Sequence, residues 1–180
     1  FTGRPLALQS EEKQVNAILN VWFGGTEAGA AIADVLTGKV SPTGKLTMSF
    51  PRVTGQCPIY YNHKMTGRPM SPDAWYTRYV SNYIDVLNEP LYPFGYGLSY
   101  TTYTYGDVSL NMNSMDANGK IQASVIVTNT GAQDGEEIVQ LYLRDIVRSI
   151  TPPVQELKGF KRVALKAGES KKVTFDIDVD

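Results

Sequence analysis

The chain has little of what marks several protein classes, beginning with cysteine and histidine. It contains one cysteine, Cys57, and one histidine, His63. A single cysteine excludes an internal disulfide, and a lone thiol fits inert packing better than a reactive site. Because His63 has no cysteine or second histidine at ligand spacing, we expect no structural zinc site. The sequence also has no phosphate-binding loop and no dinucleotide fingerprint, so we predict neither a metal nor a cofactor.

Long hydrophobic runs and an excess of one charge are missing too. No apolar run approaches the length that a bilayer-spanning helix needs. The formal net charge is -1, which gives no reason to expect nucleic acid or a membrane surface as a partner. With 42% hydrophobic and 19% charged residues, the composition is ordinary for a globular protein, and 180 residues allow one domain or two small ones.

The most informative stretch is residues 90–101, which we call the aromatic ribbon. Large apolar residues alternate here with small ones: Tyr92, Phe94, Tyr96, Leu98 and Tyr100 against Pro93, Gly95, Gly97 and Ser99. An extended chain sends alternate side chains to opposite faces, so we predict one aromatic face and one bare face. A bare face allows another backbone to approach closely, and an aromatic face needs covering. We therefore expect the ribbon to join two structured parts rather than to serve as a platform for sugars.

The first 51 residues predict helices and strands in alternation. Ser10 as a helix cap, with apolar residues at 15, 18 and 19, predicts a helix over 10–19, and residues 21–23 predict a short buried strand. A second helix is expected from Thr26 to Gly38. Its stripe of apolar side chains should pack on a sheet: Ala28, Ala31, Ile32, Val35 and Leu36. Alternation over 46–50 predicts another strand. This order is typical of an α/β layer, although these elements are too few to build one alone.

The rest of the chain divides into an irregular stretch and a β-rich region. Residues 52–89 show little periodicity and are rich in Tyr, Pro, Asn and Gly, as in a linker or a functional loop. From Tyr103 onward, apolar residues alternate with mostly polar ones in several short runs separated by turn signals, which predicts a β-sandwich. We expect the charged residues of this region to point outward from its strands: Glu136, Glu137, Arg144 and Asp145.

Three motifs carry a resemblance to a known family. Residues 93–101 (PFGYGLSYT) resemble the hallmark of glycoside hydrolase family 3, the β-glucosidase-type exo-glycosidases, in which this motif precedes a fibronectin type III-like domain. Residues 24–38 (GGTEAGAAIADVLTG) are similar to the last helix of the family's α/β sandwich domain, and residues 41–51 (SPTGKLTMSFP) are similar to the strand that follows it. The motifs occur in the family's order and spacing, and together with the downstream strands the resemblance covers nearly the whole chain.

The resemblance implies a fold class and a division of the chain. We expect α/β plus all-β: the C-terminal part of an α/β sandwich layer followed by a fibronectin type III-like, immunoglobulin-like β-sandwich, truncated at both ends. The expected parts are the α/β layer over 1–51, an interdomain linker with the aromatic ribbon over 52–101, and the sandwich over 102–180. We count five strand-like segments after Tyr100, whereas such sandwiches commonly have seven strands, so we expect the last strands to be missing.

Hydrolysis with retention requires two carboxyl groups about 5 to 5.5 Å apart. In the family that this chain resembles, the nucleophile is an aspartate of an N-terminal (β/α)8 barrel, and the acid/base usually precedes the segment seen here. Neither motif matches a residue of this chain, so we predict no catalytic residue in it. Glu27 lies in a glycine-flanked turn at a helix start, where an acid is explained by the helix dipole.

The best candidate for substrate contact lies in the irregular stretch. Aromatic faces stack on sugar rings, and amide, imidazole and cationic groups donate hydrogen bonds to hydroxyls. On these grounds we predict five substrate-binding residues: Tyr61, Asn62, His63, Lys64 and Arg68. The alternative is a linker whose polar residues are solvated or bridge domains. We expect a second group to fix the segment before the ribbon through an Arg–Asp pair, the alternative being a wall of the substrate pocket: Tyr76, Arg78, Tyr79 and Asp85.

Two functions remain open. The first is the C-terminal portion of a retaining β-glucosidase that removes terminal non-reducing β-D-glucosyl residues, with an oligosaccharide or an aryl or alkyl glycoside as substrate and the barrel of the same parent protein as partner. In this reading the chain braces the catalytic cleft and is inactive alone. The resemblance implies a periplasmic or secreted location, and it leaves glucose, xylose, arabinose and N-acetylglucosamine specificities open. The second is a non-catalytic carbohydrate-binding or adhesion module.

Overall fold

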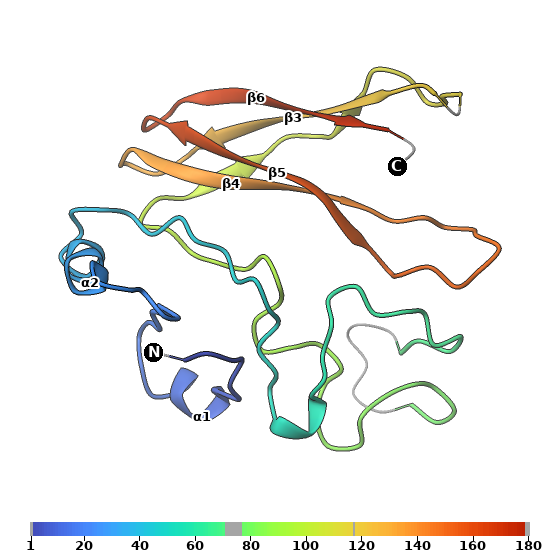
Figure 1. The fold of residues 1–180 in the computed structure, drawn as a ribbon, viewed down its shortest axis with the longest axis horizontal. Helices are drawn as coiled ribbons and strands as arrows, with labels where there is room; N and C mark the ends of the chain where they lie inside the picture. The colour runs from blue at the N-terminus through green and yellow to red at the C-terminus, as the bar shows by residue number, and fades with distance from the viewer. Residues whose placement is uncertain (1, 71–76, 117, 179–180) are drawn as a thin grey trace. The chain divides into compact units, whose positions relative to one another are not determined.

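The computed structural model describes residues 2–70, 77–116 and 118–178. These residues form two compact units (Figure 1). The first unit comprises residues 1–33, 45–96 and 144–156, and the second comprises residues 34–44, 97–143 and 157–180. The chain passes between the two units several times, and one of these points lies inside the aromatic ribbon, between Tyr96 and Gly97.

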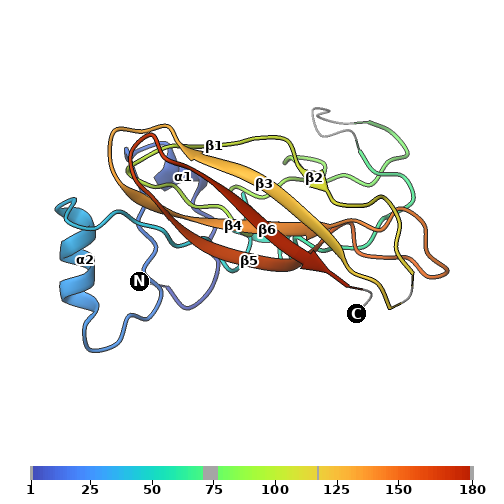
Figure 2. The ribbon, with the colours of Figure 1, turned by 90° about the horizontal axis from the view of Figure 1, so that it is seen from above.

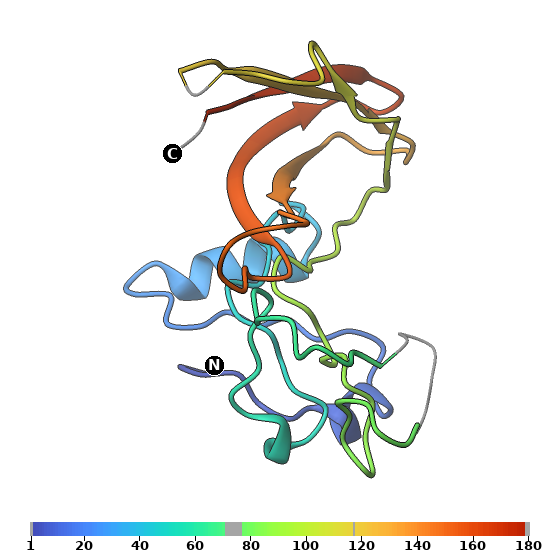
Figure 3. The ribbon, with the colours of Figure 1, turned by 90° about the vertical axis from the view of Figure 1, so that its right-hand side faces the viewer.

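The second unit contains two antiparallel β-sheets. The strands are β1 (Tyr103–Tyr105), β2 (Ser109–Leu110), β3 (Ile121–Asn129), β4 (Gly135–Leu143), β5 (Glu156–Leu165) and β6 (Ser170–Ile177). Strand β3 is central to the first sheet: it pairs with β1, β2 and β6, and Figure 2 shows β3 and β6 running side by side. Strands β4 and β5 form the second sheet. Figure 3 shows the two sheets as two layers, which confirms the predicted sandwich.

The core of the sandwich lies between the two sheets. Val127 and Val173 come from the first sheet, Val139 and Leu165 come from the second, and each of these side chains is at most 5% exposed. In β3 and β6 the register places Ala123 opposite Phe175, so the apolar residues of both strands fall on the same face. This is the result that alternation in the sequence predicts.

Two expectations about the β-region are wrong. The described residues after 100 contain six strands rather than five, because β1 and β2 are three and two residues long and too short to show a period. Glu137 does not point outward: it is 7% exposed and accepts a hydrogen bond from the Tyr105 hydroxyl at 2.8 Å. It has the same parity along β4 as Val139, so the alternation itself assigns it to the inner face.

The first unit has less regular structure than the sequence predicts. Helix α1 covers only Gln9–Glu12, and Ser10 lies inside it and donates to the Glu11 carboxylate at 2.6 Å instead of capping the helix. The expected continuation to residue 19 is absent from the described chain. Val15, Ile18 and Leu19 are 48%, 40% and 40% exposed. Without packing on that face, so short a helix is not stable.

The second helix is confirmed, but not its burial. Helix α2 covers Ala28–Leu36, and Gly38, with φ of 75°, adopts the left-handed backbone that ends it. None of its side chains is buried, and Leu36 is 68% exposed. Among the described residues, no strand makes an extensive contact with α2. The expected strand at 21–23 is also wrong, because Trp22 has a φ of 46° and Phe23 is 82% exposed.

Residues 46–50 do not form a strand, but they do run beside the aromatic ribbon. Backbone hydrogen bonds join Phe50 N to Tyr92 O at 2.8 Å and Leu46 N to Tyr96 O at 2.8 Å. Between these two contacts the ribbon turns, because Gly95 has a φ of 80° and Tyr96 N donates to Pro93 O at 3.1 Å. The ribbon is therefore not one extended strand with a single aromatic face, as the alternation predicts. Among the described residues, no helix is both long and apolar enough to cross a membrane.

Candidate functional site

A wall of aromatic rings in the first unit supports the candidate site. The rings of Tyr61 and Phe94 stack with centroids 4.1 Å apart and an interplanar angle of 14°. Phe94 is also held through its backbone, because its N–H donates to the hydroxyl of buried Ser49 at 3.2 Å. Tyr92 and Tyr96 stack at 5.4 Å. The ring of Phe50, 1% exposed, anchors the segment from which Ser49 comes.

Buried Gln56 fixes the loop that enters the site. Its side-chain oxygen accepts a hydrogen bond from Arg52 N at 2.6 Å, and its side-chain nitrogen donates to Leu87 O at 2.8 Å. It lies at the end of the short 3-10 helix η1 (Thr54–Gln56) and is 1% exposed. An amide that satisfies both its donor and its acceptor in this way fixes one loop conformation. Residues 57–62 therefore leave η1 from a defined position.

A cavity of about 600 Å³ lies against these elements. Its lining comes from four parts of the first unit: residues 4–7, residues 47–49 with Pro51, Thr54 with residues 57–62, and Phe94. Most of this lining is apolar or aromatic, with Arg4 and Asn62 among the polar contributors. The volume and the lining are those of a small-molecule site. Cys57, expected to be packed, is exposed and borders this cavity.

The structure brings together only part of the predicted set of five residues. Tyr61 and Asn62 line the cavity, but one face of the Tyr61 ring is already covered by Phe94. His63, Lys64 and Arg68 are exposed and are not among the described residues that line it.

These three residues are positioned mainly by their backbone. Val154 N donates to His63 O at 2.9 Å, and Ser81 N donates to Arg68 O at 2.8 Å. Lys64 forms an isolated antiparallel β-bridge with Pro153. The role of all five residues in substrate binding stays a prediction.

Of the described residues that line this cavity, the predicted set of five contains only Tyr61 and Asn62, and it leaves out the aromatic rings of Tyr60 and Phe94. Tyr60 lines it and is 61% exposed, so its ring offers more free surface than that of Tyr61. Its place beside Tyr61 in the sequence was the available signal. Phe94 lines it too, although the alternation of the ribbon predicts a joining role for that ring.

Burial raises the pKa of the Tyr92 phenol above its ordinary value, with the Glu12 carboxylate adding to the effect, so this hydroxyl stays protonated at neutral pH.

The cavity has a largely apolar and aromatic lining, with no carboxyl group among the described residues that line it. None of the described residues that line it is an aspartate or a glutamate, and a retaining glycosidase needs two carboxyl groups. The described residues also contain no cluster of three or more His, Cys, Asp or Glu side chains that could hold a metal ion. Glu27 is exposed and lies immediately before α2, where its carbonyl accepts a hydrogen bond from Ala31 N at 3.1 Å.

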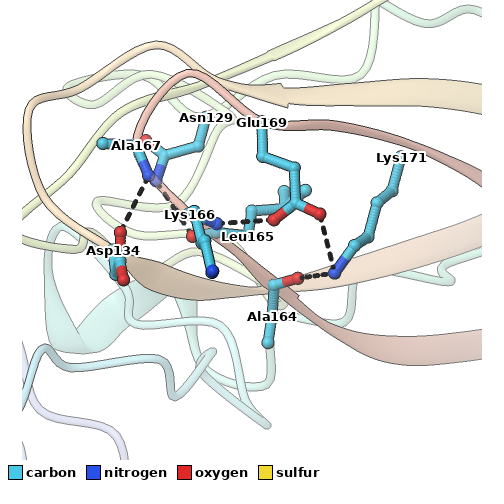
Figure 4. A network of polar contacts seen from close by, with 8 residues as sticks. All are labelled: Asn129, Asp134, Ala164, Leu165, Lys166, Ala167, Glu169 and Lys171. Atoms are coloured by element: carbon cyan, nitrogen blue, oxygen red, sulfur yellow. Dashed lines mark hydrogen bonds and ion pairs between the residues drawn. The ribbon is translucent and has the colours of Figure 1, made fainter.

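A second cavity of about 610 Å³ lies in the second unit, and half of the described residues that line it are charged. Two of its carboxylates, those of Asp134 and Glu169, belong to a network of polar contacts (Figure 4). Asp134 accepts from Ala167 N at 2.9 Å, and Glu169 accepts from Lys166 N at 2.8 Å and pairs with Lys171 at 3.2 Å. The Lys166 N–H, followed by the Lys171 ammonium, holds the pKa of Glu169 below its usual value. No aromatic side chain is among the described residues lining this cavity, so it is a weaker candidate for sugar binding.

The expected Arg–Asp pair before the ribbon is not formed. Arg78 and Asp85 are both exposed, and the structure records no ion pair between them. Tyr76 lies outside the described residues. Of the three described residues in this group, Tyr79 alone has a positive φ, of 66°, and its side chain is 80% exposed.

Comparison with known proteins identifies the family. Residues 1–100 match the model described as the glycosyl hydrolase family 3 C-terminal domain, and residues 137–180 match a fibronectin type III-like domain. The chain is 54% identical over 180 residues to a periplasmic β-glucosidase of Salmonella typhimurium, covering 100% of this chain and 23% of that protein. It is 46% identical to a β-xylosidase of Formosa agariphila, covering 100% of this chain and 24% of that protein.

Comparison with solved structures also finds β-glucosidases. The β-glucosidase from Listeria innocua in complex with glucose superposes with a TM-score of 0.91 at 47% identity, over 97% of this chain and 24% of that one. The chain thus spans about a quarter of the length of these relatives. The predicted fold class, an α/β part followed by a fibronectin type III-like sandwich, is confirmed. Because the C-terminal domain model matches residues 1–100 of 180, the chain belongs to glycosyl hydrolase family 3.

Proposed function

We propose that this chain is the C-terminal, non-catalytic portion of a retaining, exo-acting β-glucosidase that removes terminal non-reducing β-D-glucosyl residues. One observation carries the proposal: 54% identity over all 180 residues to a periplasmic β-glucosidase. The 46% identity to a β-xylosidase makes xylose the second candidate sugar. The periplasmic β-glucosidase relative also supports a periplasmic or secreted location.

The roles that we propose for this chain and for the rest of the parent protein follow from the positions of the carboxyl groups. The cavity in the first unit offers aromatic and amide groups but no aspartate or glutamate among its described lining residues. Two carboxyl groups of the parent protein, one of them on an N-terminal (β/α)8 barrel, would carry out displacement through a covalent glycosyl-aspartate. This chain would brace the catalytic cleft. Its boundaries at 1–51, 52–101 and 102–180 are proposed with it, and the fact that the six strands of the described residues all begin after residue 102 supports the last of them.

The proposal is tested by kinetics of the full-length parent on a panel of chromogenic aryl β-glycosides. We expect kcat/KM to be highest for the glucoside among the glucoside, xyloside, arabinoside and N-acetylglucosaminide. Proton NMR of the first-formed sugar should show the β-anomer, as retention requires. A higher kcat/KM for the xyloside would transfer the assignment to a β-xylosidase. No turnover of any glycoside would favour a carbohydrate-binding or adhesion module.

The predicted contacts of the loop at 61–68 are tested separately. We propose that Asn62 and Arg68 donate hydrogen bonds to substrate hydroxyls, with Tyr61, His63 and Lys64 beside them. Asn62→Ala and Arg68→Ala in the parent should each raise KM by about tenfold, the effect of losing one hydrogen bond to a bound ligand. Lys158→Ala removes another exposed cation, on β5, and serves as the control. Unchanged KM values in both loop variants would leave this loop as a linker.

A further inference from the structure

The loop between β4 and β5 exposes three large apolar side chains within five residues, and we call residues 146–150 the apolar tip. The side chains of Ile146, Val147 and Ile150 are 84%, 84% and 74% exposed. Figure 1 shows the segment between the two strands as a long loop, and residues 144–156 belong to the first unit. Exposed apolar side chains that gather in this way mark a surface that another part of a protein covers.

The apolar tip is held in a defined shape by polar groups at its edge. The Asp145 carboxylate accepts a hydrogen bond from Val147 N at 3.1 Å and forms an ion pair with the Arg148 side chain. On the other side of the tip, Pro152 and Pro153 follow each other, and two prolines in succession restrict the backbone. Apolar side chains on a fixed turn, with a charged pair beside them, have the anatomy of an interface: an apolar centre and a polar rim.

The end of this loop is joined to the loop that we propose contacts substrate. Val154 N donates to His63 O at 2.9 Å, and Pro153 forms an antiparallel β-bridge with Lys64. Ile150 precedes Pro153 by three residues, so its Cα lies within about 11 Å of that of Pro153. The apolar tip is therefore close to the loop at 61–68.

We propose that the apolar tip packs on the part of the parent protein that lies outside these 180 residues. The chain spans about a quarter of the length of its relatives, so most of the parent is available to cover the tip. On the proposed β-glucosidase function, on which the choice of this partner rests, a substrate that contacts the loop at 61–68 must also reach the catalytic carboxyl groups. A tip beside that loop therefore lies toward the part that carries them, and its contact would hold the loop in place.

The test measures how accessible the tip is in the full-length parent. Val147→Cys puts a thiol in the tip and keeps a small apolar side chain, so it should not disturb folding. Lys172→Cys, at an exposed position of β6, is the matched control. Each variant is alkylated with N-ethylmaleimide, and peptide mass spectrometry follows the modification at the introduced thiol. In the folded parent we expect the thiol at 147 to react at least about tenfold more slowly than the one at 172, and in urea to react equally fast.

A second substitution tests whether apolar packing causes the protection. Adding Ile150→Asp to Val147→Cys puts a charge into the contact and should raise the alkylation rate at 147 by about fivefold. Ile126→Asp, at a 53% exposed isoleucine of β3, is the control and should leave that rate unchanged.

Equal alkylation rates at 147 and 172 in the folded parent would overturn the proposal. Protection at 147 that disappears on dilution of the parent would also overturn it, because the tip would then pack on a second copy of the protein. Hydrolysis of a chromogenic β-glucoside, measured on the same samples, separates this proposal from the proposed function. Stable protection at 147 in a parent that hydrolyses no glycoside would support the contact and overturn the β-glucosidase function.

Discussion

At the scale of single residues, the Asn129 side chain makes several hydrogen bonds within the sandwich. It is fully buried at the end of β3. Its side-chain nitrogen donates to Gln133 O at 2.7 Å and Leu165 O at 3.2 Å, and its oxygen accepts from the Thr101 hydroxyl at 2.6 Å. One amide therefore joins the end of the ribbon, the loop before β4 and the end of β5.

Removing this amide should destabilise the fold strongly. We expect Asn129→Ala to lower the free energy of unfolding by about 3 kcal/mol, because several buried donors and acceptors lose their partner together. Urea denaturation of the purified chain measures this. Asn111→Ala is the control: Asn111 is exposed and accepts one hydrogen bond, from Gln122 N at 2.7 Å. An equal, small effect of both substitutions would show that the network around Asn129 is not important for stability.

The contact between Tyr105 and Glu137 predicts a pH dependence. Burial, with the hydrogen bond to Glu137 as the second cause, raises the pKa of Tyr105 well above its ordinary value of 10.0. A folded-state pKa above the unfolded one adds stability that is fully present below pH 10 and is lost as the pH rises toward the folded value. We expect Tyr105→Phe to lower the free energy of unfolding by about 1 kcal/mol at pH 7. The effect is no larger because the Tyr105 side chain is half exposed.

Urea unfolding at a series of pH values tests the sign of this effect. The difference in unfolding free energy between wild type and Tyr105→Phe should be constant from pH 7 to about pH 9 and should shrink above about pH 10. Tyr142→Phe is the control, because the Tyr142 hydroxyl donates to the neutral side chain of Gln140 at 2.5 Å. A difference that grows at high pH would contradict the account.

At the scale of elements, the turn between β3 and β4 is tightly packed at Gly131. A Cβ atom there would lie 2.1 Å from the Thr101 hydroxyl oxygen and 3.0 Å from the backbone nitrogen of Thr102. Because backbone cannot move aside as a side chain can, Gly131→Ala should destabilise the sandwich by about 2 kcal/mol. Gly44→Ala is its matched control, since nothing lies within 4 Å of a Cβ at that position. Thermal unfolding of both variants would show the contrast, and equal melting temperatures would refute it.

The elements that the sequence predicted well are those that pack against each other within this chain. The alternation in β3 and β6 predicts their inner faces because both sheets of the sandwich are present to cover them. The helix expected at 10–19 and the burial of the α2 stripe were wrong because the described chain covers those faces only in part: Val15 is 48% exposed and Leu36 is 68% exposed. Strands β1 and β2 were too short for any periodic signal.

The candidate site was predictable only in part. Composition identified the loop at 60–68, because aromatic and amide residues gather there. The inclusion of Phe94 and of residues 4–7 depends on contacts between segments far apart in the sequence, which periodicity does not report. Similarly, Glu137 was placed outside because of its charge, although its parity assigned it to the core. The strained backbone of Tyr79 has no signal in the sequence.

At the scale of the whole molecule, the proposed function requires different roles for this chain and for the rest of the parent protein. The 180 residues span about a quarter of the length of their β-glucosidase and β-xylosidase relatives. The cavity best suited to a sugar ring has no carboxyl group among its described lining residues. The chain is therefore expected to contribute support and contacts to substrate, with the two carboxyl groups that cleave the bond elsewhere in the parent.

The most direct test compares the purified 180-residue chain with the full-length parent on one chromogenic aryl β-glucoside. Circular dichroism of the isolated chain should first confirm its β-sheet signal, so that inactivity is not due to unfolding. The account predicts no turnover by the chain above the uncatalysed rate and clear turnover by the parent under the same conditions. Hydrolysis of the glucoside by the isolated chain would contradict it, because the bond-cleaving carboxyl groups would then lie within these residues.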